Sequence, residues 1–242
     1  MSIRSKLAQS KLAKGAARWM TDNRGLVVAA TALPASFLLE RARVTRDLLH
    51  ARYGASPEKH DERVRRVQEQ VRAWKASGSE RPMCTARPPW LTVSTRTSTY
   101  KKDCNHIEIN LRDILEVDTD RMVIRVEPLA NMGQISRYLV PMGYALKVMV
   151  EMEDLTAGGL CMGLGMETTC HRYGLIQETV AAYEIVTADG NLLRVTQESD
   201  PELFHGLPWS HGTLGFLVAL ELEIEPAKPY IRMKYIPCHS MD

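Results

Sequence analysis

The sequence predicts an α+β protein in which one mixed domain follows an N-terminal helical segment. Two observations predict this fold class. From Arg81 onward, short apolar runs alternate with turn residues, which is typical of β-strands with short helices between them. Before Arg81 lie a basic leader with one long apolar run and an amphipathic helix. The 242 residues, 45% of them hydrophobic and 25% charged, are enough for one domain with a sizeable core.

The leader is basic and the rest of the chain is mildly acidic. Residues 1–80 carry 16 Lys and Arg against 8 Asp and Glu, and the remaining residues carry 15 against 21. This asymmetry indicates an arm that meets a membrane or a polyanion. Nucleic acid is the weaker of the two partners and is not expected, because no set of aromatic residues accompanies the basic ones.

An apolar run, LVVAATALPASFLL, extends from Leu26 to Leu39 within this leader. Fourteen residues are fewer than the roughly 20 that a membrane-spanning helix needs, and Pro34 is expected to interrupt the run. A signal peptide, a buried helix and an interfacial or marginally spanning anchor all remain possible. The anchor accounts best for the basic flank, which can meet anionic lipid headgroups.

Residues 61–76, DERVRRVQEQVRAWKA, predict an amphipathic helix. Val64, Val67, Val71 and Trp74 recur at helical spacing and define one apolar face. Two acidic residues in the first turn complement the helix dipole, and a glycine two residues after the helix offers a stop. We expect this helix to pack on the domain that follows.

The domain itself is predicted to contain seven strands and two helices. Period-2 alternation and apolar runs place the strands at 91–95, 106–110, 122–128, 144–150, 182–188, 192–196 and 216–226. Asp189-Gly190 predicts a hairpin between two of them. A helix is expected within 131–143, where Pro141 ends it early, and another at 201–209, where a proline takes the first helical position.

The five cysteines are scattered and odd in number, and they form neither a Cys-x-x-Cys pair nor a metal-ligand spacing. This pattern argues against a disulfide framework and favours a reducing compartment. We expect no metal site.

The segment from Asp154 to Gly174, DLTAGGLCMGLGMETTCHRYG, is rich in glycine and threonine. Glycines let the backbone approach a ligand closely, and threonine hydroxyls add neutral donors, a combination that suits a pyrophosphate. Neither a Walker A motif nor a complete G-x-G-x-x-G fingerprint is present. A long loop whose glycines only supply turns is the alternative.

The order of motifs resembles the FAD-binding domain of the vanillyl-alcohol oxidase and p-cresol methylhydroxylase (PCMH) superfamily. Within it, the chain is most similar to the Δ24-sterol reductase (Diminuto-type) family. The stretches that carry the resemblance are RVQEQVRAWK (66–75), LTVS (91–94), NLRDILEVDTD (110–120), RVEPLANMGQ (125–134), DLTAGGL (154–160) and PWSHGTLGFLVALE (208–221).

The resemblance implies a PCMH-type FAD-binding domain of two α/β subdomains after a membrane-associated helical segment. It implies the layout 1–60 for the basic leader with its anchor, 61–80 for a connecting amphipathic helix and 81–242 for the FAD-binding domain, without the substrate domain that follows in the family. The residues expected to bind the cofactor are Thr156, Ala157, Gly158, Gly159, Leu160, Met162, Gly163, Gly165, Thr168, Thr169, Tyr173, Gly174, Gly212 and Gly215.

Four polar side chains of these segments have alternative interpretations. His171 is expected to be an exposed loop residue, and His211 either approaches the flavin or makes a local hydrogen bond. Glu153 and Asp154 either accept hydrogen bonds from a flavin ribose or, as we expect, cap the turn before the glycines. No catalytic residue is assigned.

The chain departs from the family in the first phosphate-facing turn. The family has T-G-R-P-G-W there, and this chain has Thr85-Ala86-Arg87-Pro88-Pro89-Trp90. If either glycine position needs a positive φ, alanine is strained there and proline is excluded. The histidine that tethers flavin covalently in some relatives is also missing from this turn, so FAD is expected to be dissociable.

The reaction that the resemblance implies is reduction of the sterol side-chain C24 double bond, with NADPH as electron donor and FAD as hydride carrier. It also implies a place on the endoplasmic reticulum membrane, facing the cytosol. A catalytically inactive FAD-binding membrane protein and a related FAD-dependent oxidase are the alternatives.

Overall fold

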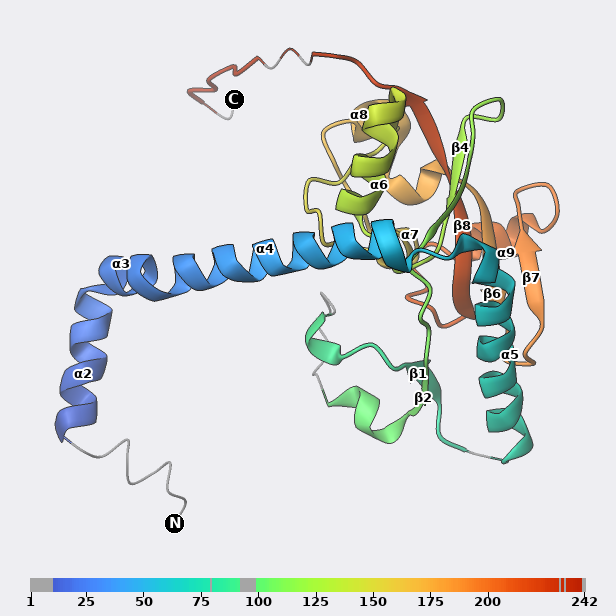
Figure 1. The fold of residues 1–242 in the computed structure, drawn as a ribbon, viewed down its shortest axis with the longest axis horizontal. Helices are drawn as coiled ribbons and strands as arrows, with labels where there is room; N and C mark the ends of the chain where they lie inside the picture. Colours follow the sequence, from blue (N-terminus) through green and yellow to red (C-terminus); the bar gives the residue numbers. More distant parts are fainter. Residues whose placement is uncertain (1–10, 79, 92–98, 231, 233, 241–242) are drawn as a thin grey trace. The chain divides into compact units, whose positions relative to one another are not determined.

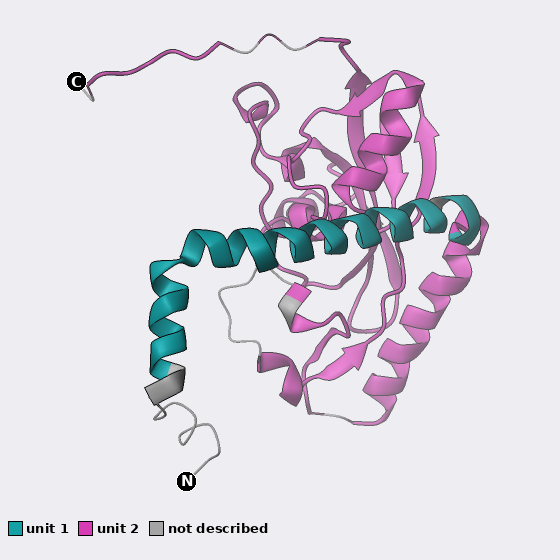
Figure 2. Ribbon diagram, turned by 60° about the vertical axis from the view of Figure 1, so that its left-hand side comes forward, with its two compact units in different colours: residues 1–54 teal, residues 55–242 magenta. Residues whose placement is uncertain are grey.

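The computed structural model describes residues 11–78, 80–91, 99–230, 232 and 234–240. The chain divides into two compact units, residues 1–54 and 55–242 (Figures 1 and 2). The first unit is helical, with elements α2 (Lys11–Asp22), α3 (Arg24–Val27), a π-helical turn (Val28–Ala32), α4 (Leu33–Leu49) and a second π-helical turn (His50–Gly54).

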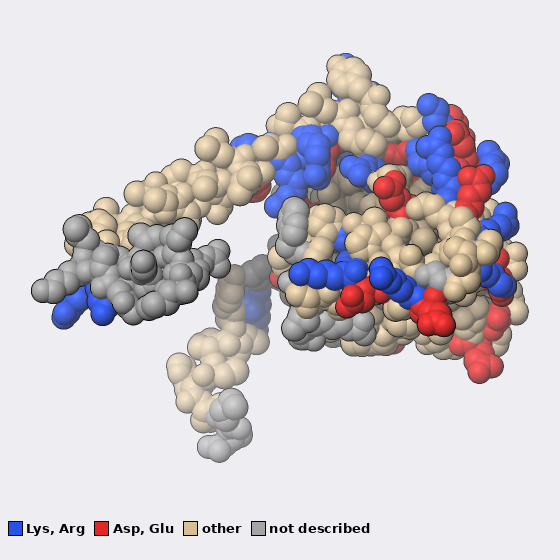
Figure 3. Space-filling model, turned by 90° about the horizontal axis from the view of Figure 1, so that it is seen from below, with Lys and Arg blue, Asp and Glu red and all other residues tan. Residues whose placement is uncertain are grey.

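In the first unit, Arg24–Gly54 is a continuous helical stretch of 31 residues that contains an 18-residue window with a mean hydropathy of 1.3. Within the described residues it is the one helix long and apolar enough to cross a membrane. The sequence has no charged residue between Arg24 and Glu40, and Figure 3 shows much of this helix without basic or acidic atoms. Length and composition thus permit a membrane span.

The expectation that Pro34 interrupts the apolar run is wrong. The helix continues through Pro34, which lies in the first turn of α4, directly after the π-helical turn. There the N–H of Leu33 donates to the carbonyl of Val28, five residues back. Such a wider turn is a known way for a helix to rearrange its hydrogen bonds around a proline, which has no N–H to donate.

The second unit begins with a 3₁₀ turn (Pro57–Lys59) and α5 (His60–Ala76). The predicted amphipathic helix is confirmed, because Val64, Val67 and Val71 are buried. They form a core with residues of strands β2 (Asn105–Ile107), β6 (Val180–Val186) and β8 (Phe216–Pro226). Trp74 lies at the edge of this face, and its indole N–H donates to the carbonyl of Arg81 at 2.9 Å.

A six-stranded antiparallel sheet forms the body of the second unit, in the order β3-β4-β8-β6-β7, with β5 also paired to β8. A separate parallel pair joins β1 to β2. The strands are β1 (Met83–Thr85), β2 (Asn105–Ile107), β3 (Ile114–Asp118), β4 (Val123–Val126), β5 (Tyr144–Leu146), β6 (Val180–Val186), β7 (Leu192–Val195) and β8 (Phe216–Pro226).

Most of the predicted strands are confirmed, although several are shorter than expected. β8 has the predicted bounds, and β2, β4, β5, β6 and β7 overlap their predicted ranges. β1 and β3 were not predicted. The predicted strand at 91–95 lies almost wholly outside the described residues; its first residue, Leu91, ends a 3₁₀ turn (Pro89–Leu91).

The central strand β8 contributes to two cores. Its register against β6 shifts between Glu184 and Ile185, so that Val218 is an extra residue in β8. Phe216 and Val218 therefore pack with α5. After this bulge the alternate residues Leu220, Leu222 and Ile224 point into the larger core, where they pack with α6 (Met132–Leu139) and α7 (Ala157–Cys161). The alternation predicts the strand but does not reveal the bulge.

The two predicted helices are confirmed. α6 (Met132–Leu139) begins with a capping box in which Asn131 and Gln134 satisfy each other's backbone N–H groups, and a 3₁₀ turn containing Pro141 ends it. α9 (Pro201–Gly206) starts with the proline, and Asp200 caps it.

The predicted Asp189-Gly190 hairpin joins β6 to β7. Gly190 has φ +77°, and its carbonyl accepts hydrogen bonds from Gln68 and Arg72 of α5, each at 2.9 Å. The hairpin thus also fixes α5 against the sheet.

Replacing Gly190 with alanine should lower the free energy of unfolding by about 1–2 kcal/mol, because alanine is strained at this positive φ. Chemical denaturation followed by circular dichroism measures the loss. Asp189→Ala is the matched control; it removes only an exposed ion pair with Lys75 and should cost less than about 1 kcal/mol. Equal stability of the Gly190→Ala and wild-type proteins would contradict the prediction.

A buried ionic network links α5 to the segments before β3 and after β4, which carry Asp113 and Glu127. The Glu127 side chain is fully buried; one carboxylate oxygen is bonded to His60 Nδ1 at 2.8 Å and Arg63 Nη2 at 2.7 Å, and the other accepts the N–H of Asp113 at 2.7 Å. Arg63 also donates to the Asp113 carboxylate at 2.8 Å. These buried charges are therefore paired and hydrogen-bonded.

Candidate functional site

A buried lysine holds the turn that follows β1 through hydrogen bonds. Lys101, from the 3₁₀ turn Tyr100–Asp103, donates through Nζ to the Thr85 carbonyl at 2.6 Å, the Thr85 hydroxyl at 3.1 Å and the Arg87 carbonyl at 2.5 Å. Sequence reasoning missed Lys101, because nothing in Lys101-Lys102 distinguishes the buried lysine from the exposed one.

The two glycine replacements in this turn fit its backbone. Among the described residues, positive φ outside glycine is confined to Met122, Trp209 and His211. Ala86 and Pro89 therefore adopt no left-handed conformation, and the strain considered for them from sequence is absent from this structure.

Arg87 joins this turn to the glycine-rich segment. Its Nη1 donates to the Thr156 hydroxyl at 3.1 Å. Thr156 directly precedes the short helix α7 (Ala157–Cys161). Burial lowers the pKa of Arg87, and no carboxylate pairs with it among the described residues. Two segments expected to contact phosphate, far apart in sequence, thus meet at a half-buried cation.

The glycines of α7 have different roles. The N–H groups of Ala157 and Gly158 donate to the carbonyls of Ala130 at 2.8 Å and Pro128 at 2.9 Å. A Cβ on Gly158 would lie 2.7 Å from Pro128, so this glycine permits close packing. Gly159 is exposed; a Cβ there would approach only the Thr156 hydroxyl, at 3.0 Å, and its N–H has no backbone partner in the described part of the chain. Gly159 is thus the residue whose amide can reach a ligand.

The turn before β8 lies against the end of the glycine-rich helix. The N–H of His211 donates to the carbonyl of Met162 at 2.9 Å. A Cβ on Gly163 would be 2.7 Å from the Gly159 carbonyl and 3.5 Å from the His211 ring. Trp209, His211 and Gly212 all have positive φ, at 66°, 51° and 79°. Strained backbone of this kind clusters at functional sites.

Other residues predicted for the site have structural contacts instead. Leu160 and Met162 are buried in the core. Gly165 packs on Ile176, where a Cβ would come within 2.3 Å, and Gly215 packs on the carbonyl of Val186.

Among the described residues, no hydrogen bond or ion pair joins the predicted residues around α8 (Cys170–Tyr173) to Arg87, Thr156 or His211. Thr168 and Thr169 directly precede that helix, and Gly174 caps its end with φ +76°. The Tyr173 hydroxyl donates to the Glu225 carboxylate, which raises the pKa of Tyr173. This tyrosine therefore faces the end of β8.

The remaining polar candidates have local partners. His171 is exposed, and its Nδ1 lies 2.7 Å from the Thr168 carbonyl, as expected for a loop residue. Glu153 pairs with Arg137 at 2.8 Å. Asp154 is exposed and lies in the turn that is closed by the hydrogen bond from the Leu155 N–H to the Met152 carbonyl at 3.2 Å.

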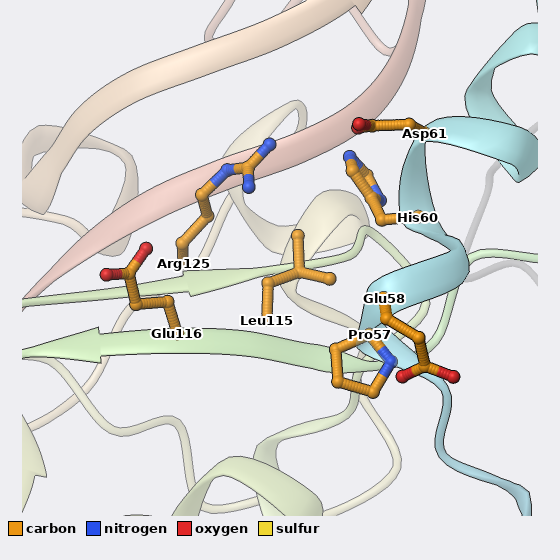
Figure 4. A pocket seen from close by; sticks show the side chains of 7 residues that line it. All are labelled: Pro57, Glu58, His60, Asp61, Leu115, Glu116 and Arg125. Atoms are coloured by element: carbon orange, nitrogen blue, oxygen red, sulfur yellow. The ribbon is translucent and has the colours of Figure 1, made fainter.

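A pocket of about 400 Å³ lies elsewhere, between the start of α5 and strands β3 and β4 (Figure 4). Its main cation, Arg125, is held by Glu184 through two hydrogen bonds of 2.8 Å. None of its lining residues belongs to the turn 85–90, the glycine-rich segment or the turn 208–215. The pocket is therefore separate from the candidate site.

Comparison with known proteins identifies the relatives of this arrangement. Residues 63–196 match the family model described as FAD binding domain. The Δ24-sterol reductase of Homo sapiens is 45% identical over 229 residues, which cover 95% of this chain and 44% of that protein. The Δ24-sterol reductase of Arabidopsis thaliana is 47% identical over 182 residues, which cover 74% and 32%. The chain thus spans less than half the length of the curated relatives it matches.

Two solved structures share the fold at low sequence identity. Chitooligosaccharide oxidase superposes with a TM-score of 0.57 at 17% identity, covering 67% of this chain and 34% of that one. 6-Hydroxy-D-nicotine oxidase from Arthrobacter nicotinovorans superposes with a TM-score of 0.54 at 18% identity, covering 66% and 34%. These likenesses confirm the predicted fold class.

Proposed function

Because this chain belongs to the family of FAD binding domains and is homologous to the Δ24-sterol reductases, we propose that it binds FAD without a covalent bond and serves in sterol side-chain reduction. The observation that carries the proposal is the Arg87–Thr156 hydrogen bond. It brings a half-buried cation without a carboxylate partner in the described chain next to the exposed amide of Gly159. A pyrophosphate supplies the anion that such a site lacks.

The surrounding residues fit the same group. The glycine at position 159 leaves room for a phosphate to approach the backbone, since a Cβ there would meet only the Thr156 hydroxyl. The strained turn at Trp209–Gly212 holds the His211 ring against Gly163. In this proposal Arg87, Thr156 and Gly159 bind the phosphates, and His211 lies on the side of the site toward β8. We further propose that the loop around α8 rearranges when FAD binds. The rearranged loop would then contact the cofactor through Thr168, Thr169, Tyr173 and Gly174.

FAD, when bound, supplies hydride-transfer chemistry, and this chain binds and orients it. The name of these relatives, Δ24-sterol reductase, indicates a sterol as their substrate. We propose reduction at the C24 double bond with NADPH as the electron donor. The sterol-binding groups are assigned to the part of the relatives that this chain does not span.

The N-terminal unit is proposed to attach the protein to a membrane. Its helix Arg24–Gly54 has the length and hydropathy for this role. We propose residues 1–60 as the membrane-associated leader, 61–80 as the connecting helix and 81–242 as the FAD-binding domain. The proposed location is the endoplasmic reticulum, facing the cytosol.

A visible absorbance spectrum of the detergent-solubilised chain after gel filtration tests FAD binding. The expected result is a flavin band that co-elutes with the protein and is released by denaturation. Folded protein that stays colourless and takes up no added FAD would refute the proposal. Bound flavin that NADPH does not reduce, even when the remaining part of a relative is supplied, would support an inactive FAD-binding protein instead.

Arg87→Gln should weaken FAD binding about tenfold or more, because a charge-assisted contact to phosphate is lost. Fluorescence titration with FAD measures the dissociation constant. Arg112→Gln, at an exposed position, is the matched control and should leave it unchanged. Equal affinity of the two variants would show that Arg87 does not face the phosphates.

A further inference from the structure

Lys101 is a buried ammonium group that has no anion beside it. Its exposed fraction is 4%, and its three hydrogen bonds end on two carbonyls and one hydroxyl. No Asp or Glu pairs with it among the described residues. The undescribed segment 92–98, TVSTRTS, contains no acidic residue either. A buried charge is costly unless it is paired.

A second cation lies close to this lysine. Burial lowers the pKa of Lys101, and the positive charge of Arg87 lowers it further, while the thiols of Cys84 and Cys104 oppose this. Burial lowers the pKa of Arg87 as well. Two desolvated like charges thus lie behind one short turn. The attraction of an anion bound to that turn would offset the free-energy cost of desolvating the two cations and of their mutual repulsion.

The hydrogen bonds of Lys101 define how it can act. Each of its three N–H donors is already directed to the turn 85–87, so Lys101 fixes the carbonyls on either side of Ala86 and the Thr85 hydroxyl. The carbonyl of Arg87 is one of these acceptors, and the guanidinium of the same residue contacts Thr156. Lys101 therefore holds in place the residue that joins the turn to the glycine-rich segment.

We propose that Lys101 is a positioning residue for the phosphates of FAD: it holds the 85–87 turn in shape and supplies a buried positive charge behind it. This inference rests on the proposed binding of FAD. Lys101 should therefore affect the binding of the phosphates and not that of the flavin ring, because its charge has no role toward a ligand that lacks phosphate.

The test compares FAD with riboflavin, which has the flavin ring but no phosphate. Lys101→Gln and Lys101→Met should weaken FAD binding about tenfold and leave riboflavin binding within about twofold of wild type. The dependence of FAD affinity on salt concentration should also become shallower. Lys102→Gln, at the exposed neighbouring position, is the matched control and should change none of these quantities. Thermal melting without flavin shows whether each variant is folded.

Unchanged FAD affinity in the Lys101 variants would overturn the inference, and so would an equal loss of FAD and riboflavin binding, which indicates a structural role alone. Wild-type protein that binds no FAD would instead refute the proposed function.

If neither Lys101 variant folds, the rate at which Lys101 is acetylated in the wild-type protein tests the inference. FAD should slow the acetylation of Lys101 more than riboflavin does, while Lys102 reacts equally with both ligands present. Equal rates at Lys101 with FAD and riboflavin would overturn the inference. Mass spectrometry of the peptides that carry the two lysines measures the rates.

Discussion

A Glu127→Leu protein should lose about 3–5 kcal/mol of unfolding free energy, the largest stability change expected in this chain. The substitution removes one carboxylate and leaves the buried His60 ring, the Arg63 guanidinium and the Asp113 N–H without their acceptor. Deleting one member of a buried ionic network costs this much because the groups that remain are buried without one of their hydrogen-bond partners, although Arg63 keeps its bond to Asp113. Urea unfolding followed by circular dichroism measures the change.

Two further variants sharpen this prediction. Glu127→Gln keeps one acceptor oxygen but directs an amide donor toward groups that are donors themselves, so an intermediate loss is expected. Glu116→Gln, on the exposed side of β3, is the control and should stay within about 0.5 kcal/mol of wild type. A Glu127→Leu protein as stable as the control would mean that the network contributes nothing beyond the volume it fills.

A Gly159→Ala protein should remain folded and bind FAD about tenfold to a hundredfold more weakly. Gly159 lies in α7 and has no positive φ, so alanine suits the helix and should stabilise it by up to about 1 kcal/mol. The added methyl group meets the Thr156 hydroxyl and occupies the space that the proposed phosphate needs. Overpacking of this kind costs about 1–3 kcal/mol, which corresponds to the expected loss of affinity.

Stability and affinity are thus expected to change in opposite directions, and both can be measured on one sample by thermal melting and FAD titration. Gly206→Ala is the matched control, because a Cβ there meets only Leu214 at an ordinary 3.5 Å. Its FAD affinity should equal that of wild type. Unaltered FAD binding by Gly159→Ala would place the phosphates away from this glycine.

Local sequence signals predicted the elements that are defined by their own residues. The apolar face of α5, the proline that ends α6, the proline start of α9 and the Asp189-Gly190 turn all depend on neighbours in the chain. Strands β1 and β3 were missed because they are short and only partly buried, so neither alternation nor a long apolar run identifies them.

The candidate site was predicted only in part, for a similar physical reason. The glycines show where the backbone can approach a ligand, but several of them, such as Gly158 and Gly165, serve close packing instead. The cations come from elsewhere in the chain. Arg87 meets Thr156 across 69 positions, and Lys101 is recognisable only by its burial, which depends on the tertiary fold.

The sheet order has a consequence for synthesis on the ribosome. β8 follows the other strands of this sheet in sequence and lies between β4 and β6, so β3-β4 and β6-β7 emerge as separate hairpins with no strand between them. Their inner edges stay unpaired until residues 216–226 have been translated. Exposed edges of this kind pair with other chains. The interval before β8 emerges is therefore when the nascent protein most depends on chaperones, and slow translation ahead of residue 216 should lower its yield more than slow translation after residue 226.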